Sequence, residues 1–233
     1  MKGTFPECAS CHCRKESLFN GCAMEELEEI STNKSCNVYK KGQVIFHEGN
    51  RPHGVFCVNE GKIKISRFTS DGKEQIVRLA KEGDVLGYRA LIEGNKYSAS
   101  AIALDDSKIC FLSSDDFNKI VDNNMKVAHD LLKLVAKALG DAEQKMTNLA
   151  LKPVRERLAE ALLLLKKTYH KAQEKQFSIA ISRDDLAAIV GTAKETVIRA
   201  LSEMKDENII SSQGSTITIL DENKLFKITQ LYD

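Results

Sequence analysis

The sequence contains no tryptophan, and among its 233 residues only 3 are proline and 13 are glycine. Such low proline and glycine contents exclude collagen-like and linker-like chains. Long apolar stretches are also missing. The longest one within a helical pattern is residues 161–165, far below the length of a membrane span. Residues 1–13 lack the apolar run of a secretory signal, so we expect a cytoplasmic protein with no membrane partner.

An excess of one charge is absent as well. Lysine and arginine number 34 and aspartate and glutamate 33, which gives a net charge of +1. A basic excess is a common mark of nucleic-acid binding, so DNA binding must be inferred here from where individual charges lie. The hydrophobic share of 42% is high enough for a packed core and argues against a disordered chain. The length fits one large domain or two ordinary ones.

Short apolar runs separated by glycine dominate residues 38–112, after a short polar stretch at 25–34 that predicts a surface helix. Asp71-Gly72 is a favourable tight-turn dipeptide between two of the runs. Several short strands at this spacing predict a small antiparallel sandwich or barrel. The runs are 44–46, 55–58, 62–65, 75–79, 100–104 and 108–112.

The hydrophobic period then changes to alternating steps of four and three, which is typical of a coiled-coil seam. A second apolar stripe of Leu131, Leu134 and Ala138 runs beside it, so the helix can pack on its own domain and on a second copy at once. A broad core-facing helix of a monomer is the alternative. Lys152-Pro153 is expected to end this helix. The predicted dimer seam is Ala128, Leu132, Val135, Leu139, Ala142, Met146 and Leu149.

Residues 182–204 predict two short helices joined by a tight turn, which is the helix-turn-helix pattern. Ser182 followed by Asp185 resembles a capping box, and Thr192 followed by Glu195 resembles a second one. Gly191 lies where a sharp turn needs a residue that tolerates positive φ. A connection at 170–178 precedes these helices, and two β-like runs within 209–220 follow and predict a wing.

The second helix has an informative outer face, because Val197, Leu201 and Met204 form the inner stripe. Lysine and arginine side chains pair with guanine, and glutamate accepts from cytosine. The alternative is a solvated charged face on which Glu195 and Arg199 pair with each other. The predicted DNA-binding residues are Ser182, Thr192, Lys194, Glu195, Thr196, Ile198, Arg199 and Ser202.

The chain resembles the Crp/Fnr family of bacterial transcription regulators over nearly its whole length. The resemblance is carried by the seam helix and by the stretches KKGQVIFHEGNRPHGVFCVNEGKIKI, GDVLGYRALIEG and KETVIRAL. It implies an α+β protein with an N-terminal double-stranded β-helix (a jelly roll like the cyclic-nucleotide-binding domain), a long dimerisation helix and a C-terminal winged helix-turn-helix. The implied segments are a Cys-rich segment 1–24, a sensor domain 25–122, the dimerisation helix 123–152 and the DNA-binding domain 153–233.

The resemblance also implies function. Family members bind pseudo-palindromic double-stranded DNA operators as homodimers, and a transcription activator of this kind would contact RNA polymerase. By the resemblance, Glu195 and Arg199 occupy the base-reading positions, and Lys194 falls where some members have a guanine-reading arginine. Ile198 replaces a small or polar residue that is common in the family.

Binding of a cyclic nucleotide such as cyclic AMP is not expected. The cyclic-nucleotide branch of the family places a glutamate after GDxxG and an Arg-Ser pair about ten residues later. Here the corresponding residues are Tyr88 and the pair Tyr97-Ser98, so the ribose and phosphate ligands are both absent. Arg89 lies one position away, and Tyr88, Arg89, Tyr97 and Ser98 form the predicted sensor pocket.

Seven cysteines with no secretory signal favour reduced thiols over a disulfide framework. The Fnr branch, which the chain resembles more closely, holds a 4Fe–4S cluster with three N-terminal cysteines and one at the end of the β-roll. By that resemblance the ligands are Cys8, Cys11, Cys22 and Cys110, with Cys13 as the alternative third ligand. Cys36 and Cys57 are expected to be core residues.

Other interpretations of the cysteines stay open. Zinc could be held by Cys8, Cys11, Cys22 and either Cys13 or His12. Cys8-Ala-Ser-Cys11-His12 also has the spacing of a c-type haem attachment site. A patch of reduced, redox-reactive thiols without a metal is the simplest interpretation. The signal would therefore be redox state, oxygen or nitric oxide, acting by reorientation of the C-terminal domains in a permanent dimer. A small-molecule-binding module is the alternative function, and no catalytic motif was found, so no enzyme is expected.

Overall fold

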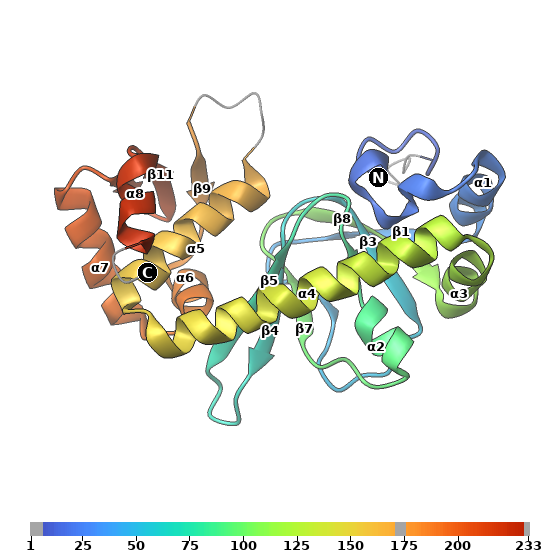
Figure 1. Ribbon diagram of the computed structural model, residues 1–233, viewed down its shortest axis with the longest axis horizontal. Helices are drawn as coiled ribbons and strands as arrows, with labels where there is room; N and C mark the ends of the chain where they lie inside the picture. The colour runs from blue at the N-terminus through green and yellow to red at the C-terminus, as the bar shows by residue number, and fades with distance from the viewer. Residues whose placement is uncertain (1–6, 171–175, 231–233) are drawn as a thin grey trace. The chain divides into compact units, whose positions relative to one another are not determined.

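The structure is a computed structural model that describes residues 7–170 and 176–230 (Figure 1). Parts of three predicted segments lie outside the described residues: 1–6 of the Cys-rich segment, 171–175 of the connection at 170–178, and 231–233 of the DNA-binding domain. Two single 3₁₀ turns, η1 (Arg14–Glu16) and η2 (Leu18–Gly21), precede helix α1 (Met24–Asn33). The predicted surface helix is therefore confirmed, one residue earlier than expected.

Two four-stranded antiparallel sheets form the β-roll that follows. Their strand orders are β1-β8-β3-β6 and β2-β7-β4-β5. All six apolar runs coincide with strands, except that Lys62 and Leu104 lie just outside theirs. Gly72 takes the positive φ of +80° that the tight turn requires. The strands are β1 (Ser35–Tyr39), β2 (Val44–Phe46), β3 (Gly54–Glu60), β4 (Ile63–Phe68), β5 (Glu74–Ala80), β6 (Val85–Leu86), β7 (Ser100–Ala103) and β8 (Ser107–Ser113).

The predicted α+β class and β-sandwich are confirmed, and three elements of the β-roll were not predicted. β1 and β6 lack a clear apolar run, and helix α2 (Tyr88–Glu93) lies between two of the predicted runs. One apolar core lies between the sheets and includes Ile63 and Ala101. A second core joins η2 and α1 to helix α3 (Ser114–Asn123), where Phe19 meets Phe117 edge to face.

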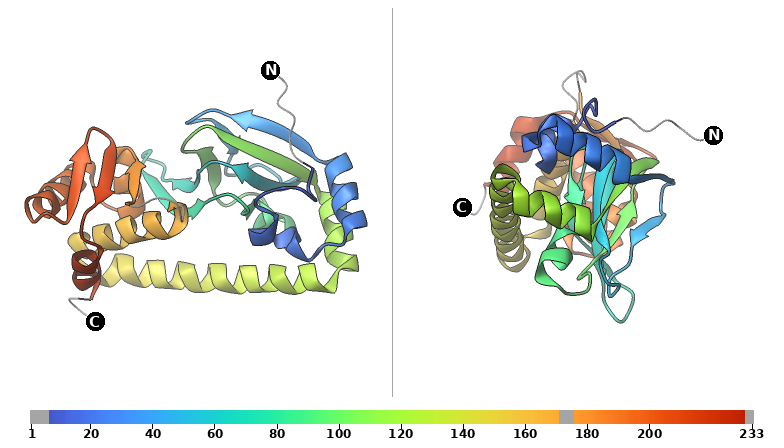
Figure 2. Two further views of the ribbon diagram at one scale, coloured as in Figure 1. Left: turned by 90° about the horizontal axis from the view of Figure 1, so that it is seen from above. Right: turned by 90° about the vertical axis from the view of Figure 1, so that its right-hand side faces the viewer.

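Helix α4 (Met125–Leu151) is 27 residues long, and Figure 2 shows it as one uninterrupted helix. Its second apolar stripe packs on its own domain, since Leu131 is only 6% exposed. The seam faces outward: Leu132, Leu139 and Met146 are 65%, 62% and 67% exposed. Val135, Ala142 and Leu149 are exposed too, and Ala128 is half-buried. The two stripes therefore differ in exposure, and the helix does not bury both of them within the chain.

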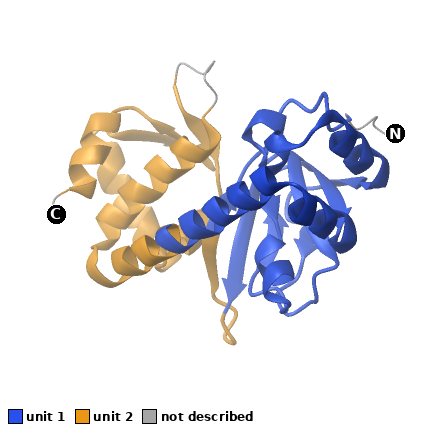
Figure 3. Ribbon diagram, turned by 45° about the vertical axis from the view of Figure 1, so that its right-hand side comes forward, with its two compact units in different colours: residues 1–68, 78–140 blue, residues 69–77, 141–233 orange. Residues whose placement is uncertain are grey.

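The chain divides into two compact units, residues 1–68 with 78–140 and residues 69–77 with 141–233 (Figure 3). In the second unit Pro153 caps helix α5 (Val154–Tyr169), so the predicted helix end at Lys152-Pro153 is confirmed. The remaining elements are β9 (Ser178–Ala180), α6 (Arg183–Val190), α7 (Lys194–Asp206), β10 (Ile210–Gln213), β11 (Thr216–Ile219) and α8 (Glu222–Thr229). Among the described residues, no helix combines the length and the apolar composition needed to cross a bilayer.

Candidate nucleic-acid interface and cysteine cavity

The turn between α6 and α7 is built from local signals in the sequence. The Ser182 hydroxyl caps α6 by accepting from the amide of Asp185, with an Oγ–N distance of 2.9 Å, so the first predicted capping box is confirmed in this bond. Gly191 follows α6 with φ of +72°, a left-handed conformation that side chains disfavour. Two short helices joined through this glycine form the helix-turn-helix.

The second predicted capping box is wrong. The N-cap of α7 is Ala193, whose side chain cannot accept a hydrogen bond, and Thr192 lies one residue too early. The reason lies in the preceding helix: the amides of Gly191 and Thr192 both donate to the carbonyl of Ala187. Because Thr192 still belongs to the C-terminal cap of α6, α7 cannot begin until the following residue.

Helix α7 is anchored by its inner stripe and presents the opposite face to solvent. Val197, Leu201 and Met204 are buried, as predicted. The side chains predicted to contact DNA lie outside this stripe: Lys194, Glu195, Ile198, Arg199 and Ser202 are exposed, and Thr196 is half-buried. In the part of the chain that the structure describes, no ion pair joins Glu195 to Arg199, so both side chains are free to meet a ligand.

A three-stranded sheet of order β10-β11-β9 supplies the predicted wing, whose turn contains Gly214. Sequence reasoning missed Arg183, the first residue of α6. Its Nη2 atom donates to Ser212 Oγ at 2.6 Å and to the carbonyl of Gly214 at 3.1 Å. Arg183 therefore ties the start of α6 to the wing. Only the long-range pairing of these segments reveals this role.

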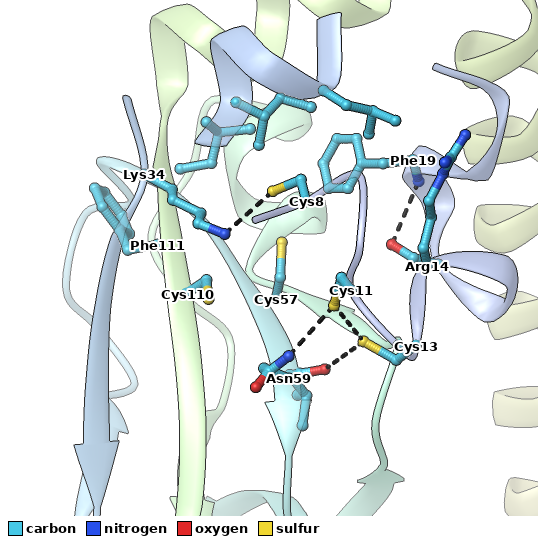
Figure 4. A pocket seen from close by; sticks show the side chains of 16 residues that line it. Cys8, Cys11, Cys13, Arg14, Phe19, Lys34, Cys57, Asn59, Cys110 and Phe111 are labelled. Atoms are coloured by element: carbon cyan, nitrogen blue, oxygen red, sulfur yellow. Dashed lines mark hydrogen bonds between the residues drawn. The ribbon is translucent and has the colours of Figure 1, made fainter. Parts of the chain in front are cut away.

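In the first unit, five cysteine side chains line one cavity, which Figure 4 shows. Cys8, Cys11 and Cys13 come from the N-terminal segment, Cys57 from β3 and Cys110 from β8. The cavity volume, measured as the space that the centre of a water molecule can occupy, is about 60 Å³. One water requires roughly 10–15 Å³ on the same measure, so the cavity has room for several. Cys110 and the Cys8-x-x-Cys11 pair thus line the same cavity, as the family resemblance implied.

Polar contacts hold the cavity thiols. Lys34 Nζ donates to Cys8 Sγ at 3.3 Å, and Asn59 Nδ2 donates to Cys11 Sγ at the same distance (Figure 4). Cys11 and Cys13 lie 3.3 Å apart, sulfur to sulfur. Burial acts to lower the pKa of Lys34, but the neighbouring thiols, Cys8 first among them, outweigh it and the pKa is raised. The cavity therefore presents sulfur ligands beside one ammonium group.

The third predicted ligand, Cys22, does not lie on this cavity. It belongs to the apolar core around Phe19 and Leu27, where burial raises the pKa of its thiol to about 12. Cys13, the alternative third ligand, lines the cavity instead. Its pKa is also raised to about 12, by burial and then by Cys11. Cys57 was expected in the core. It packs against this apolar core, as expected, and strand pairing also places it on the cavity.

No three His, Cys, Asp or Glu side chains of the described residues converge closely enough to hold a metal ion. The cavity thus supplies suitable thiol groups in one place without fixing them around a single point. All of its candidate ligands are sulfur atoms, which are the usual ligands of iron–sulfur clusters. The donor set fits such a group in kind, with Cys8, Cys11, Cys13 and Cys110 as the residues that would hold it.

The four residues of the predicted sensor pocket differ in burial: two are buried and two are exposed. Tyr88 is 1% exposed and Tyr97 stacks on Phe46, with ring centroids 4.1 Å apart. Arg89 and Ser98 are exposed. Tyrosine rings therefore lie in apolar packing at the positions where the cyclic-nucleotide branch carries charged ligands.

Comparison with known families identifies both halves of the chain. Residues 36–124 match the family model described as a cyclic nucleotide-binding domain, and residues 156–228 match the model of a Crp-like helix-turn-helix domain. The first match spans the β-roll with α3. The second spans α5 through most of α8, including the helix-turn-helix and the wing.

Curated relatives and solved structures agree with these matches. The cyclic AMP receptor protein of Thermus thermophilus is 29% identical over 91% of this chain and 95% of its own length. The transcriptional activator protein anr of Pseudomonas aeruginosa is 28% identical over 92% of this chain and 91% of its own. The structure of FixK2 from Bradyrhizobium japonicum is 27% identical with a TM-score of 0.74, covering 84% of this chain and 96% of that one. Relatives from both branches thus match at nearly equal identity.

Proposed function

The chain belongs to the Crp/Fnr family of DNA-binding transcription regulators, and from this premise we propose that it acts as a homodimer on a pseudo-palindromic operator. The observation that carries the proposal is the face of α7, where Lys194, Glu195 and Arg199 are exposed above a buried inner stripe. A recognition helix reads base edges from its first turns. Lys194 and Arg199 would pair with guanine and Glu195 with cytosine.

Dimerisation is proposed through α4. Its outward stripe of Leu132, Leu139 and Met146 is apolar and more than half exposed, and it follows the heptad spacing of a two-stranded coiled coil. A second copy of the same stripe is the complementary surface. Two copies of α7 would then meet successive major grooves about 34 Å apart. As an activator, the bound dimer would contact RNA polymerase.

The DNA-binding proposal is tested by selecting operators from a random duplex pool with the full-length protein. We expect an enriched site with two inverted half-sites. Arg199→Ala should weaken binding to that site about ten- to hundredfold, as expected for loss of a base-reading pair. Lys205→Ala, which removes one exposed charge from the other end of α7, serves as the control and should change affinity little. Equal binding by the wild type and Arg199→Ala would contradict the proposed role of α7.

The signal is proposed to reach the sensor through the cysteine cavity rather than through a cyclic nucleotide, as in the Fnr-like branch. Cys8, Cys11, Cys13 and Cys110 would hold a 4Fe–4S cluster, which would supply a group that reacts with oxygen, nitric oxide or redox partners. Support comes from the shared cavity of these thiols and from the apolar packing of Tyr88 and Tyr97. Lys34 and Asn59 donate to two of the sulfurs and would orient them.

This part of the proposal is tested by purification without oxygen, a visible spectrum, and assays for iron, sulfide and zinc. We expect a coloured protein with iron and sulfide. Cys13→Ser should lower the iron content, whereas Cys22→Ser should retain it, because Cys22 does not line the cavity. A colourless, metal-free protein that binds its operator equally well in air would eliminate the cluster. Stoichiometric zinc without iron would replace it with a zinc site.

A further inference from the structure

Three cysteines of the sensor sheet lie in one row across three adjacent strands. Cys110 of β8 is directly opposite Cys36 of β1 on one side and directly opposite Cys57 of β3 on the other. Directly paired residues of antiparallel strands project from the same face of the sheet. The three thiols, here termed the thiol row, therefore share one face. All three cysteines are free.

The backbone spacing of such a pair suits a disulfide bond. Directly opposite residues in an antiparallel ladder have Cα atoms about 4.5 or 5.5 Å apart, depending on the hydrogen-bonding position. Disulfides form across Cα separations of about 4.4–6.8 Å. Both positions of the ladder fall within this range, so Cys110 can bond to a neighbour in the row without a large movement of the backbone.

The position of its strand favours Cys36 over Cys57 as the partner. β1 is the edge strand of its sheet, whereas β3 lies between β8 and β6. An edge strand adjusts more readily to the geometry of a new bond. Cys36 is also partly exposed, while Cys110 is only 9% exposed, so an oxidant from solvent meets Cys36 first.

We propose that Cys36 and Cys110 form an oxidisable dithiol that closes into a cross-strand disulfide in response to hydroperoxides. The peroxide transfers one oxygen atom to the Cys36 thiol, giving a sulfenic acid, and leaves as water or an alcohol. Cys110 Sγ then attacks Cys36 Sγ, the S–O bond breaks, and the hydroxyl group leaves as water with the Cys110 proton. Two thiols are oxidised to one disulfide, and one hydroperoxide is reduced.

Closure would remove the Cys110 thiol from the cavity. The regulatory consequence rests on the proposed function: a disulfide at Cys110 would compete with ligation of a cluster by that residue. The disulfide itself does not depend on whether a cluster is ever bound, because it needs only the pairing of β1 with β8. The two proposals can therefore fail separately.

The test uses the full-length protein, reduced and free of metal, and treated with hydrogen peroxide. After free thiols are blocked, proteolytic peptides are mapped by mass spectrometry without reductant. We expect one cross-linked pair of peptides that contains Cys36 and Cys110, lacks two hydrogen atoms, and disappears on treatment with dithiothreitol. Cys36→Ser should abolish the cross-link, and the matched variant Cys57→Ser should retain it.

Other results would overturn the proposal. Cross-links that join only Cys11 to Cys13, or Cys57 to Cys110, would assign the oxidation to other pairs, and oxidation to sulfinic acid without a cross-link would exclude a dithiol. The parallel iron assay separates this result from the proposed function. A protein that binds iron but forms no cross-link would contradict only the proposed disulfide. A protein that forms the cross-link but never binds iron would contradict only the proposed cluster.

Discussion

Lys194 of α7 is paired with Asp184 of α6, with Lys194 Nζ 2.8 Å from Asp184 Oδ2. The lysine proposed to read guanine is therefore already engaged by a carboxylate in the free protein. Both side chains are exposed, and exposed ion pairs contribute only about 0–1 kcal/mol to stability. DNA can thus displace Asp184, but at a cost, and the carboxylate adds a negative charge beside the first turn of the proposed recognition helix.

Replacement of this carboxylate should strengthen DNA binding. Asp184→Asn frees Lys194 and removes one charge that repels phosphate, so we expect affinity for the selected operator to rise about two- to fivefold at low salt, and less at high salt. Fluorescence anisotropy titrations at two salt concentrations measure this effect. Asp122→Asn, the same charge change on the exposed end of α3, is the control. Unchanged or weaker binding by Asp184→Asn would show that the pair does not restrain Lys194.

A missing cap at α7 leads to a second prediction. Ala193 has the extended backbone of an N-cap, with φ of −69° and ψ of 147°, but its side chain cannot accept a hydrogen bond. Ala193→Ser should supply the acceptor and stabilise the protein by about 1 kcal/mol. Urea unfolding followed by circular dichroism measures the change. Thr192→Ala is the matched control, since Thr192 does not cap α7, and it should change stability by less than about 0.5 kcal/mol. A larger loss in the control would restore Thr192 as the cap.

The capping error shows what local patterns can and cannot predict. Period and turn residues located the six strand runs, the helix of the seam and both helices of the helix-turn-helix, because these depend on neighbours in the sequence. The N-cap of α7 was misplaced by one residue because the end of α6 takes the amide of Thr192. The C-terminal cap of α6 and the N-cap of α7 compete for Thr192, and neither capping pattern, taken alone, reveals this competition.

Errors among the cysteines have a different origin. Cys22 lies in the apolar core and Cys13 lines the cavity in its place, while Cys57 packs against that core, as expected, and also lines the cavity. Cys57 is brought next to Cys110 by pairing of β3 with β8, whose residues are far apart in the sequence. Spacing within the N-terminal segment carries no information about such long-range pairing. Resemblance to a family identified the β-roll position of Cys110, but it left Cys22 and Cys13 open as the third ligand.

The seam of α4 predicts a dimer that depends on apolar contact. Leu139 is 62% exposed in the middle of the stripe, and Leu139→Glu would place like charges opposite each other across the two-fold axis. We expect the wild type to sediment as a dimer at micromolar concentration and Leu139→Glu as a monomer. Operator binding should weaken about hundredfold, because the two half-sites are no longer joined.

Lys137→Glu provides the control for this experiment, because Lys137 is exposed on the same helix but lies outside the heptad seam. It should remain a dimer. A wild-type monomer at this concentration, or a Leu139→Glu dimer, would show that α4 does not hold two copies together.

The buried thiol of Cys22 predicts a loss of stability at alkaline pH. Burial, followed by the charge of Glu26, raises its pKa from 9.0 to about 12 in the folded protein. Between these two values the unfolded chain loses the thiol proton and the folded chain keeps it. The stabilising contribution is therefore fully present below about pH 9 and is lost as the pH rises toward 12, by up to about 1.4 kcal/mol per pH unit. Urea unfolding of the wild type and of Cys22→Ala, from about pH 8 to pH 10.5, tests this. The quantity compared is the change in the free energy of unfolding with pH, so a difference in absolute stability between the two proteins does not matter. The variant should lose stability less steeply, and equal slopes would mean that Cys22 ionises as readily in the folded protein as in the unfolded chain.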